Sequence, residues 1–167
     1  MQLEFHKYQG TGNDFIVIDN RQGLFDFNDR KRIAFLCDRR IGVGADGLIL
    51  LRNHSESDFE MLYFNANGEE GSMCGNGGRC IVDFAHELGI IKEQATFIAV
   101  DGLHEAKWSD KSVSLKMINV KEVELNRNYV FLDTGSPHYV EFVSDLEKFN
   151  VLEEGRKIRY NERFKLA

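Results

Sequence analysis

Residues 72–80 read Ser72-Met73-Cys74-Gly75-Asn76-Gly77-Gly78-Arg79-Cys80, and the chain is best understood outward from this stretch. Apolar side chains at helical spacing follow over residues 79–88, and Gly89 comes next, where a helix C-terminus favours a left-handed residue. The apolar stripe consists of Cys80, Phe84 and Leu88. The pattern predicts a helix that begins after a glycine-rich turn and buries one face.

Cys74 lies just before this turn. The free amide N–H groups of a helix N-terminus stabilise negative charge, so they favour the thiolate form of Cys74. The same amides, with Gly75 and Asn76 approaching closely, can bind a substrate carboxylate. A thiolate beside a carboxylate site is what proton abstraction next to a carboxyl group needs. The alternative interpretation is a buried cysteine in an ordinary turn.

The other two cysteines, Cys37 and Cys80, are predicted to lie in the core. No C-x-x-C pair occurs and the five histidines are scattered without ligand spacing, so no metal site is expected. No G-x-S-x-G elbow supports a serine hydrolase. A cysteine hydrolase that pairs Cys74 with His138 stays open as the chemical alternative.

Composition restricts the class of protein. The chain has 167 residues, of which 43% are hydrophobic, so it can bury a core and is not disordered throughout. A net charge of −6 argues against a nucleic-acid partner. Apolar runs are too short to cross a membrane and no secretory signal is visible, so no membrane partner is expected. An odd number of cysteines disfavours a disulfide framework, and the cytoplasm is the expected location.

Strands and helices are predicted in mixed order, which indicates an α/β (α+β) class. Strands are predicted over residues 3–8, 15–18, 47–51, 59–64, 97–100, 103–108, 113–118, 129–132 and 139–143. Besides the helix at 79–88, a helix capped by Asn28 is predicted to run to about residue 39. A helical pattern over residues 145–160 is predicted to be broken by Gly155.

A second glycine motif has the letters of a dinucleotide fingerprint. Gly42-Val43-Gly44-Ala45-Asp46-Gly47 matches G-x-G-x-x-G, but it follows a charged helix and leads into a strand. A nucleotide site needs the reverse order, because the pyrophosphate sits on the N-terminus of the helix that follows the motif. No nucleotide cofactor is therefore expected.

Several motifs occur together in a fixed order. They are Gly10-Thr11-Gly12-Asn13-Asp14-Phe15, residues 42–47, Phe64-Asn65-Ala66-Asn67-Gly68 and residues 74–80. This set resembles the N-terminal half of the diaminopimelate epimerase family, and Gly135-Ser136-Pro137-His138 resembles the family motif that follows. The resemblance covers essentially the whole chain. It implies two similar domains, each a mixed β-sheet wrapped around a central helix, with residues 1–122 forming the first and residues 123–167 beginning the second.

The resemblance also implies a function: an isomerase that needs neither pyridoxal phosphate nor any other cofactor and interconverts LL- and meso-diaminopimelate, in the biosynthesis of lysine and peptidoglycan. Two cysteines would face each other across the α-carbon, one removing a proton while the other delivers one. The resemblance makes Cys74 one of this pair and His138 a modulator of a catalytic cysteine. The residues that it assigns to substrate binding are Asn13, Asn65, Gly75, Asn76 and, in place of the usual asparagine, Ser136. A homodimer is expected on the same grounds.

The sequence departs from the family pattern in three ways. Gly47 stands where some members carry a substrate-binding glutamine, and Ser136 reaches less far than asparagine. No second Cys-Gly turn follows residue 90, so the second catalytic cysteine is absent and the chain alone is expected to be inactive. Two alternatives remain open: a related racemase of proline or hydroxyproline, and an inactive truncated half that keeps its substrate-binding loops.

Overall fold

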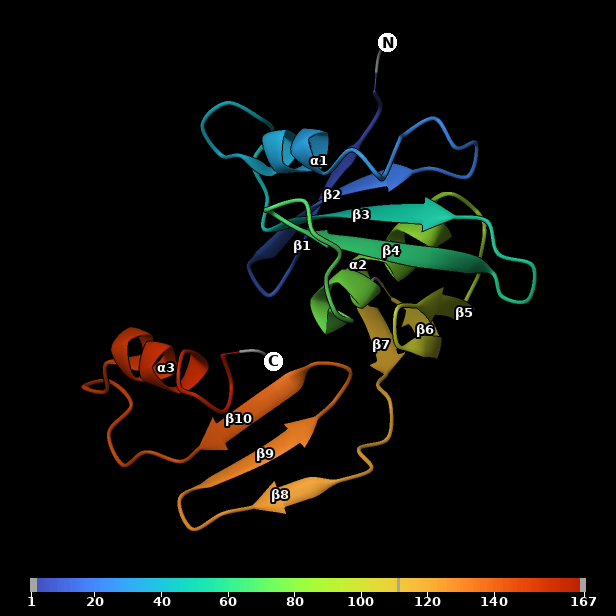
Figure 1. Cartoon of the computed structure of the whole chain (residues 1–167). Coiled ribbons are helices and arrows are strands. Elements are labelled where there is room, and N and C mark those ends of the chain that lie inside the picture. The colour runs from blue at the N-terminus through green and yellow to red at the C-terminus, as the bar shows by residue number, and fades with distance from the viewer. Residues whose placement is uncertain (1–2, 111, 166–167) are drawn as a thin grey trace. The chain divides into compact units, whose positions relative to one another are not determined.

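The computed structural model of the chain describes residues 3–110 and 112–165 (Figure 1). These residues belong to two compact units, Met1–Ile118 and Asn119–Ala167. Helices and strands alternate in mixed order, so the predicted α/β (α+β) class is confirmed. No helix in the described part of the chain is long and apolar enough to span a membrane.

The first unit is built on one sheet of seven strands, counted over the described residues. Its elements are β1 (His6–Gly10), β2 (Asn13–Asp19), α1 (Arg30–Cys37), β3 (Gly47–Arg52), β4 (Phe59–Asn65), α2 (Gly75–Glu87), β5 (Gln94–Ala99), β6 (Gly102–Ser109) and β7 (Ser112–Lys116). The strands lie in the sheet in the order of the sequence. β2 and β3 are parallel, as are β4 and β5, and all other neighbours are antiparallel.

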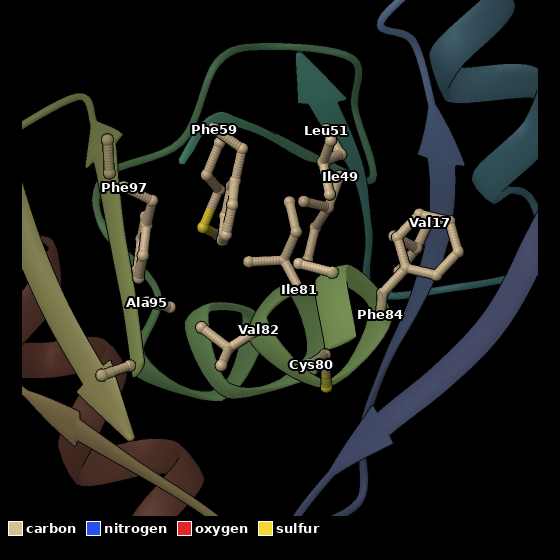
Figure 2. Close-up of a cluster of buried hydrophobic side chains, with 14 of the residues drawn as sticks. Val17, Ile49, Leu51, Phe59, Cys80, Ile81, Val82, Phe84, Ala95 and Phe97 are labelled. Atoms are coloured by element: carbon tan, nitrogen blue, oxygen red, sulfur yellow. The ribbon is translucent and has the colours of Figure 1, made fainter. Parts of the chain in front are cut away.

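The sheet curls around α2, which contacts both of its edge strands, β1 and β7. The helix is therefore buried on more than the one predicted stripe: Ile81 and Val82 are as deeply buried as Phe84. Figure 2 shows these side chains among those of the surrounding strands, including the parallel rings of Phe59 on β4 and Phe97 on β5. A helix that is apolar on most sides belongs in the centre of a fold.

The strands β2 and β3 are buried on both faces, which explains their uninterrupted apolar runs. Side chains alternate along a strand. Accordingly, Phe15 and Ile49 face the core around α2, whereas Ile16 and Leu48 face a second core. That second core lies beneath α1, which contributes Ile33 and Cys37. The sheet is thus covered by α2 on one face and by α1 on the other (Figure 1).

The structure corrects the start of α2, which was predicted at residue 79 but begins at Gly75. The glycine-rich turn is itself the first turn of the helix, because these glycines serve close packing. A Cβ added at Gly77 would lie 3.0 Å from Ile49 Cδ1, and one at Gly78 would lie 2.8 Å from Leu115 Cδ2. Packing of this kind outweighs the low helix propensity of glycine, about 1 kcal/mol per residue.

The start of α1 is also corrected. Asp29, not Asn28, is the N-cap, and its Oδ1 accepts a hydrogen bond of 3.0 Å from the backbone N–H of Arg32. The backbone N–H of Asn28 instead donates to the Asp26 carboxylate. The helix ends at Cys37 rather than near residue 39, because the chain turns to an extended conformation at Asp38.

The second unit is a small antiparallel sheet followed by a helix. Its elements are β8 (Val123–Leu125), β9 (Tyr129–Asp133), β10 (Pro137–Glu141) and α3 (Val151–Arg159). The strand β8 was not predicted, and β10 begins earlier than the predicted residue 139. Gly155 does not break α3: nothing crowds it, and ion pairs from Lys157 to Glu153 and Glu154 support the exposed helix. That residues 123–167 begin a second, pseudo-symmetric domain stays a prediction.

Candidate active site

Cys74, Gly75, Asn76 and Asn13 lie together at the N-terminus of α2. The tight turn between β1 and β2 approaches this point closely at Gly10. A Cβ added at Gly10 would lie 3.2 Å from the Asn76 carbonyl oxygen. Only a residue without a side chain permits that approach without a shift of the backbone. Asn13, the first residue of β2, is thereby held against the start of the helix.

Cys74 is the N-cap of α2, and its half-buried sulfur has two hydrogen-bonding neighbours. The backbone N–H of Gly77 donates to Sγ at 3.4 Å. Asn13 Oδ1 lies 3.7 Å from Sγ, where it can accept the thiol hydrogen. The first contact stabilises a thiolate and the second a thiol. The sulfur thus has one hydrogen-bond donor and one acceptor as neighbours.

The sulfur lies beside a row of hydrogen-bonded polar side chains, which it contacts through Asn13. Asn13 Nδ2 donates to Asp46 Oδ2 at 2.8 Å, and Asn76 Nδ2 donates to Asn13 Oδ1 at 3.4 Å. Arg79 Nη2 donates to Asn76 Oδ1 at 2.5 Å. The row thus runs from a carboxylate through two amides to a guanidinium.

Asp46 belongs to a cluster of charges beside the site. Arg39 Nη2 lies 2.6 Å from Asp14 Oδ1 and 2.8 Å from Asp46 Oδ1, and Lys7 Nζ lies 2.7 Å from Asp14 Oδ2. The Arg39 guanidinium, followed by Lys7, holds the pKa of the Asp14 carboxyl well below its usual range. The hydrogen bond from Asn13, assisted by Arg39, lowers the pKa of Asp46. Both carboxylates therefore stay charged in mildly acidic solution.

This cluster predicts an acid-sensitive stability. A carboxyl whose pKa is lower in the folded state stabilises the fold above its unfolded pKa, about 4, and that contribution is lost as the pH falls through the folded value. The free energy of unfolding from urea titrations is expected to fall below about pH 4. In Arg39→Met the fall should be shallower, because the pKa of Asp14 returns toward its ordinary value. The control is Arg40→Met, which leaves the cluster intact; equal slopes in the two variants would contradict this account.

Tyr63 on β4 also faces the site, and its ring lies between two glycines. A Cβ at Gly47 would lie 2.5 Å from Tyr63 Cε2, and one at Gly71 would lie 2.5 Å from Tyr63 Cδ1. Burial, followed by the nearby charges of Cys74 and Asp46, raises the pKa of Tyr63 to about 12, so its hydroxyl stays protonated. A Cβ at position 47 would also lie 2.5 Å from the Phe64 carbonyl oxygen, so the backbone and the ring together leave no room for a side chain there.

The remaining predicted site residues are Asn65 in the first unit and Ser136 and His138 in the second. Asn65 ends β4 opposite Gly47, and its side-chain nitrogen lies beside Gly71. Ser136 and His138 lie together in the second unit, where the Ser136 carbonyl oxygen is 2.7 Å from His138 Nδ1. A carbonyl can only accept, so that nitrogen carries the hydrogen and Nε2 is left as the acceptor of the neutral ring.

Cys37 and Cys80 are buried, as predicted, and burial raises the pKa of each thiol to about 11. Across residues 3–110 and 112–165, no group of three His, Cys, Asp or Glu side chains could hold a metal ion. Sequence reasoning missed the contributions of Asp46, Arg79 and Tyr63. The signal for the first two is a single charged residue inside or next to a glycine motif.

Comparison with known proteins places these features in context. Residues 5–123 match the model of the diaminopimelate epimerase family. The chain is 55% identical over 161 residues to the diaminopimelate epimerase of Flavobacterium psychrophilum, a match that covers 96% of this chain and 63% of that protein. It is 46% identical over 161 residues to the diaminopimelate epimerase of Chlorobaculum tepidum, covering 92% of this chain and 62% of that protein. The chain thus spans about three-fifths of the length of these curated relatives.

Among solved structures, the chain is similar to a phenazine biosynthesis protein of the PhzF family from Bacillus anthracis. The TM-score is 0.65 at 16% sequence identity, over 86% of this chain and 56% of that one. Similarity at this level of identity concerns the fold alone.

Proposed function

The chain belongs to the diaminopimelate epimerase family, and on that premise we propose that it supplies one catalytic half of an enzyme that interconverts LL- and meso-diaminopimelate without a cofactor. The observation that carries the proposal is the sulfur of Cys74, which has a hydrogen-bond donor and an acceptor as neighbours. Such an enzyme would serve the biosynthesis of lysine and peptidoglycan.

In the proposed reaction, the Cys74 thiolate removes the α-proton of the substrate and becomes a thiol. The proton leaves its electron pair on the α-carbon, and an acid on the opposite face, which we propose to be a second cysteine in a protein of the relatives' length, returns a proton with inversion. In the reverse direction Cys74 begins as the thiol and donates. Gly77 N–H donates to the thiolate form of Cys74, and Asn13 Oδ1 accepts from the thiol form. A hydrogen-bonding partner is therefore in place for the reaction in either direction.

The substrate carboxylate next to the reacting carbon is proposed to bind at the first turn of α2. Backbone N–H groups of Gly75 and Asn76 belong to the unpaired donors of that turn, and they stabilise the charge that develops as the α-proton leaves. Asn13 lies within reach of the same point. We also propose that Asn65 and Ser136 bind the substrate and that His138 modulates a catalytic cysteine.

Solvent exchange tests this function. The protein, extended to the length of its relatives, is incubated in D2O with diaminopimelate, and deuterium at the α-carbon is measured by mass spectrometry. Rapid incorporation is expected with diaminopimelate and none with proline or hydroxyproline. The 167-residue chain alone is expected to give little or no epimerisation, because it lacks the opposing acid. Exchange into proline instead of diaminopimelate would identify a racemase of the related type.

A further inference from the structure

The side-chain amides of Asn13 and Asn76 are each hydrogen-bonded to a charged side chain that can either only donate or only accept. Asp46, as a carboxylate, can only accept, and it binds Asn13. Arg79, as a guanidinium, can only donate, and it binds Asn76. A primary amide has an accepting oxygen and a donating nitrogen, so each charged partner determines which end of its amide it meets.

The orientation of the amides follows from these two contacts. Asn13 must turn Nδ2 toward Asp46, which leaves Oδ1 toward Cys74 Sγ. Asn76 must turn Oδ1 toward Arg79, which leaves Nδ2 to donate to Asn13 Oδ1. If Asn13 alone turned over, its Nδ2 would meet the Nδ2 of Asn76, and two donors would face each other. The two orientations therefore support one another.

We propose that Asp46 and Arg79 are positioning residues that fix the amides of Asn13 and Asn76, so that a hydrogen-bond acceptor always faces the Cys74 sulfur. Neither charged group touches the sulfur through a hydrogen bond of its own. Their effect on catalysis rests on the proposed function, because it matters only if Cys74 alternates between thiol and thiolate. The orientation itself can be tested without turnover.

Replacing Asp46 by asparagine should remove the hydrogen-bond acceptor that orients the Asn13 amide. Arg39 donates to Asp46 Oδ1, so the carbonyl oxygen of the new amide remains with Arg39. Its nitrogen then stands in place of Oδ2, where it meets the donors Asn13 Nδ2 and Asp14 N–H. Asn13 then meets a donor in either orientation, at position 46 if it stays and at Asn76 if it turns over, so its orientation is no longer fixed and its Nδ2 is expected to face the sulfur in part of the molecules. The thiol then loses its acceptor, and the thiolate gains a donor.

The experiment measures alkylation of Cys74 by iodoacetamide in the 167-residue chain, with the modified cysteine identified by mass spectrometry. At a pH where the thiol form predominates, Asp46→Asn is expected to react about three- to tenfold faster than the unsubstituted chain, the ratio that corresponds to one net hydrogen bond. Asp46→Glu, which keeps an acceptor-only group, should react at nearly the original rate. An unchanged rate in Asp46→Asn would overturn the proposal.

Loss of a negative charge near Cys74 would also favour the thiolate, so the charge must be controlled. The ionisable groups around the sulfur come from several elements: Tyr63 on β4, Arg79 and Cys80 on α2, and Asp46 before β3. Asp14→Asn removes an equal charge from the same cluster, but the Asp14 side chain does not bond to Asn13. Equal acceleration in Asp14→Asn and Asp46→Asn would assign the effect to charge alone and overturn the orientation argument.

A second measurement covers the case in which Asp46→Asn fails to fold, which alkylation of the buried Cys37 would reveal. In the unsubstituted chain, the side-chain NH2 resonances of Asn13 are followed by NMR as the solution is acidified. Because Nδ2 donates to Asp46, these resonances should move as the Asp46 carboxyl takes up its proton. Asn13 resonances that do not move through that titration would overturn the proposal. The proposed epimerase activity is tested separately, by deuterium exchange.

Discussion

Cys74→Ser in the protein extended to the length of its relatives is expected to reduce α-deuterium incorporation into diaminopimelate at least about tenfold, about 1.4 kcal/mol of barrier. Serine is close to cysteine in shape and keeps a hydrogen-bonding group near Gly77 N–H and Asn13 Oδ1. Its hydroxyl, however, gives up its proton far less readily than a thiol, so it cannot supply the base. The rate of exchange is read from the mass of the recovered substrate.

Cys80→Ala is the matched control for this prediction. Cys80 is buried in the same helix, among the side chains shown in Figure 2, and burial raises the pKa of its thiol. Its removal is expected to lower stability modestly and to leave exchange by the folded protein unchanged. Exchange that survives Cys74→Ser at its original rate would rule out the role proposed for Cys74, whatever the outcome with Cys80.

Phe59→Ala is expected to lower the free energy of unfolding by about 3–5 kcal/mol, the largest effect on stability among the substitutions considered. Phe59 is fully buried on β4, and its ring stacks on that of Phe97 with centroids 5.1 Å apart. The two rings join parallel strands beside α2, so their separation leaves a cavity in the main core. Urea titration followed by circular dichroism measures the change.

Phe35→Ala provides the comparison for Phe59, since it removes the same atoms from a surface position of the same unit. Phe35 lies on α1 with 51% of its surface exposed, and the substitution is expected to change stability by no more than about 0.5 kcal/mol. Similar losses in the two variants would show that burial does not govern the stability of this unit.

The strands of the first unit were predictable because their patterns are unambiguous. The run over residues 15–18 has no polar side chain, and a short run rich in β-branched and aromatic residues favours a strand covered on both faces. The start of α2 was missed because Gly75, Gly77 and Gly78 argue locally against a helix. What favours the helix is distant in sequence: the side chains of Ile49 and Leu115, which occupy the space that larger residues would need.

The candidate site was predictable in part for a similar reason. Cys74, Gly75 and Asn76 are adjacent in sequence, and the family resemblance assigned Asn13 to the same site. The bond between Asn13 and Asp46 joins segments far apart in the chain, which no local pattern reveals, whereas Arg79 and Asn76 are three residues apart on the same helix. The roles of Ser136 and His138 stay predictions.

The order of the strands has a consequence for how the first unit is made. Each strand of the sheet pairs with the one synthesised just before it, so its contact order is low for a structure rich in strands, and it can fold in steps as translation proceeds. Only the two parallel pairs need longer loop closures, through the connections that contain α1 and α2. Cys74 lies on the second of these connections. We therefore expect the structure around Cys74 to form late, after β5 has emerged from the ribosome and paired with β4.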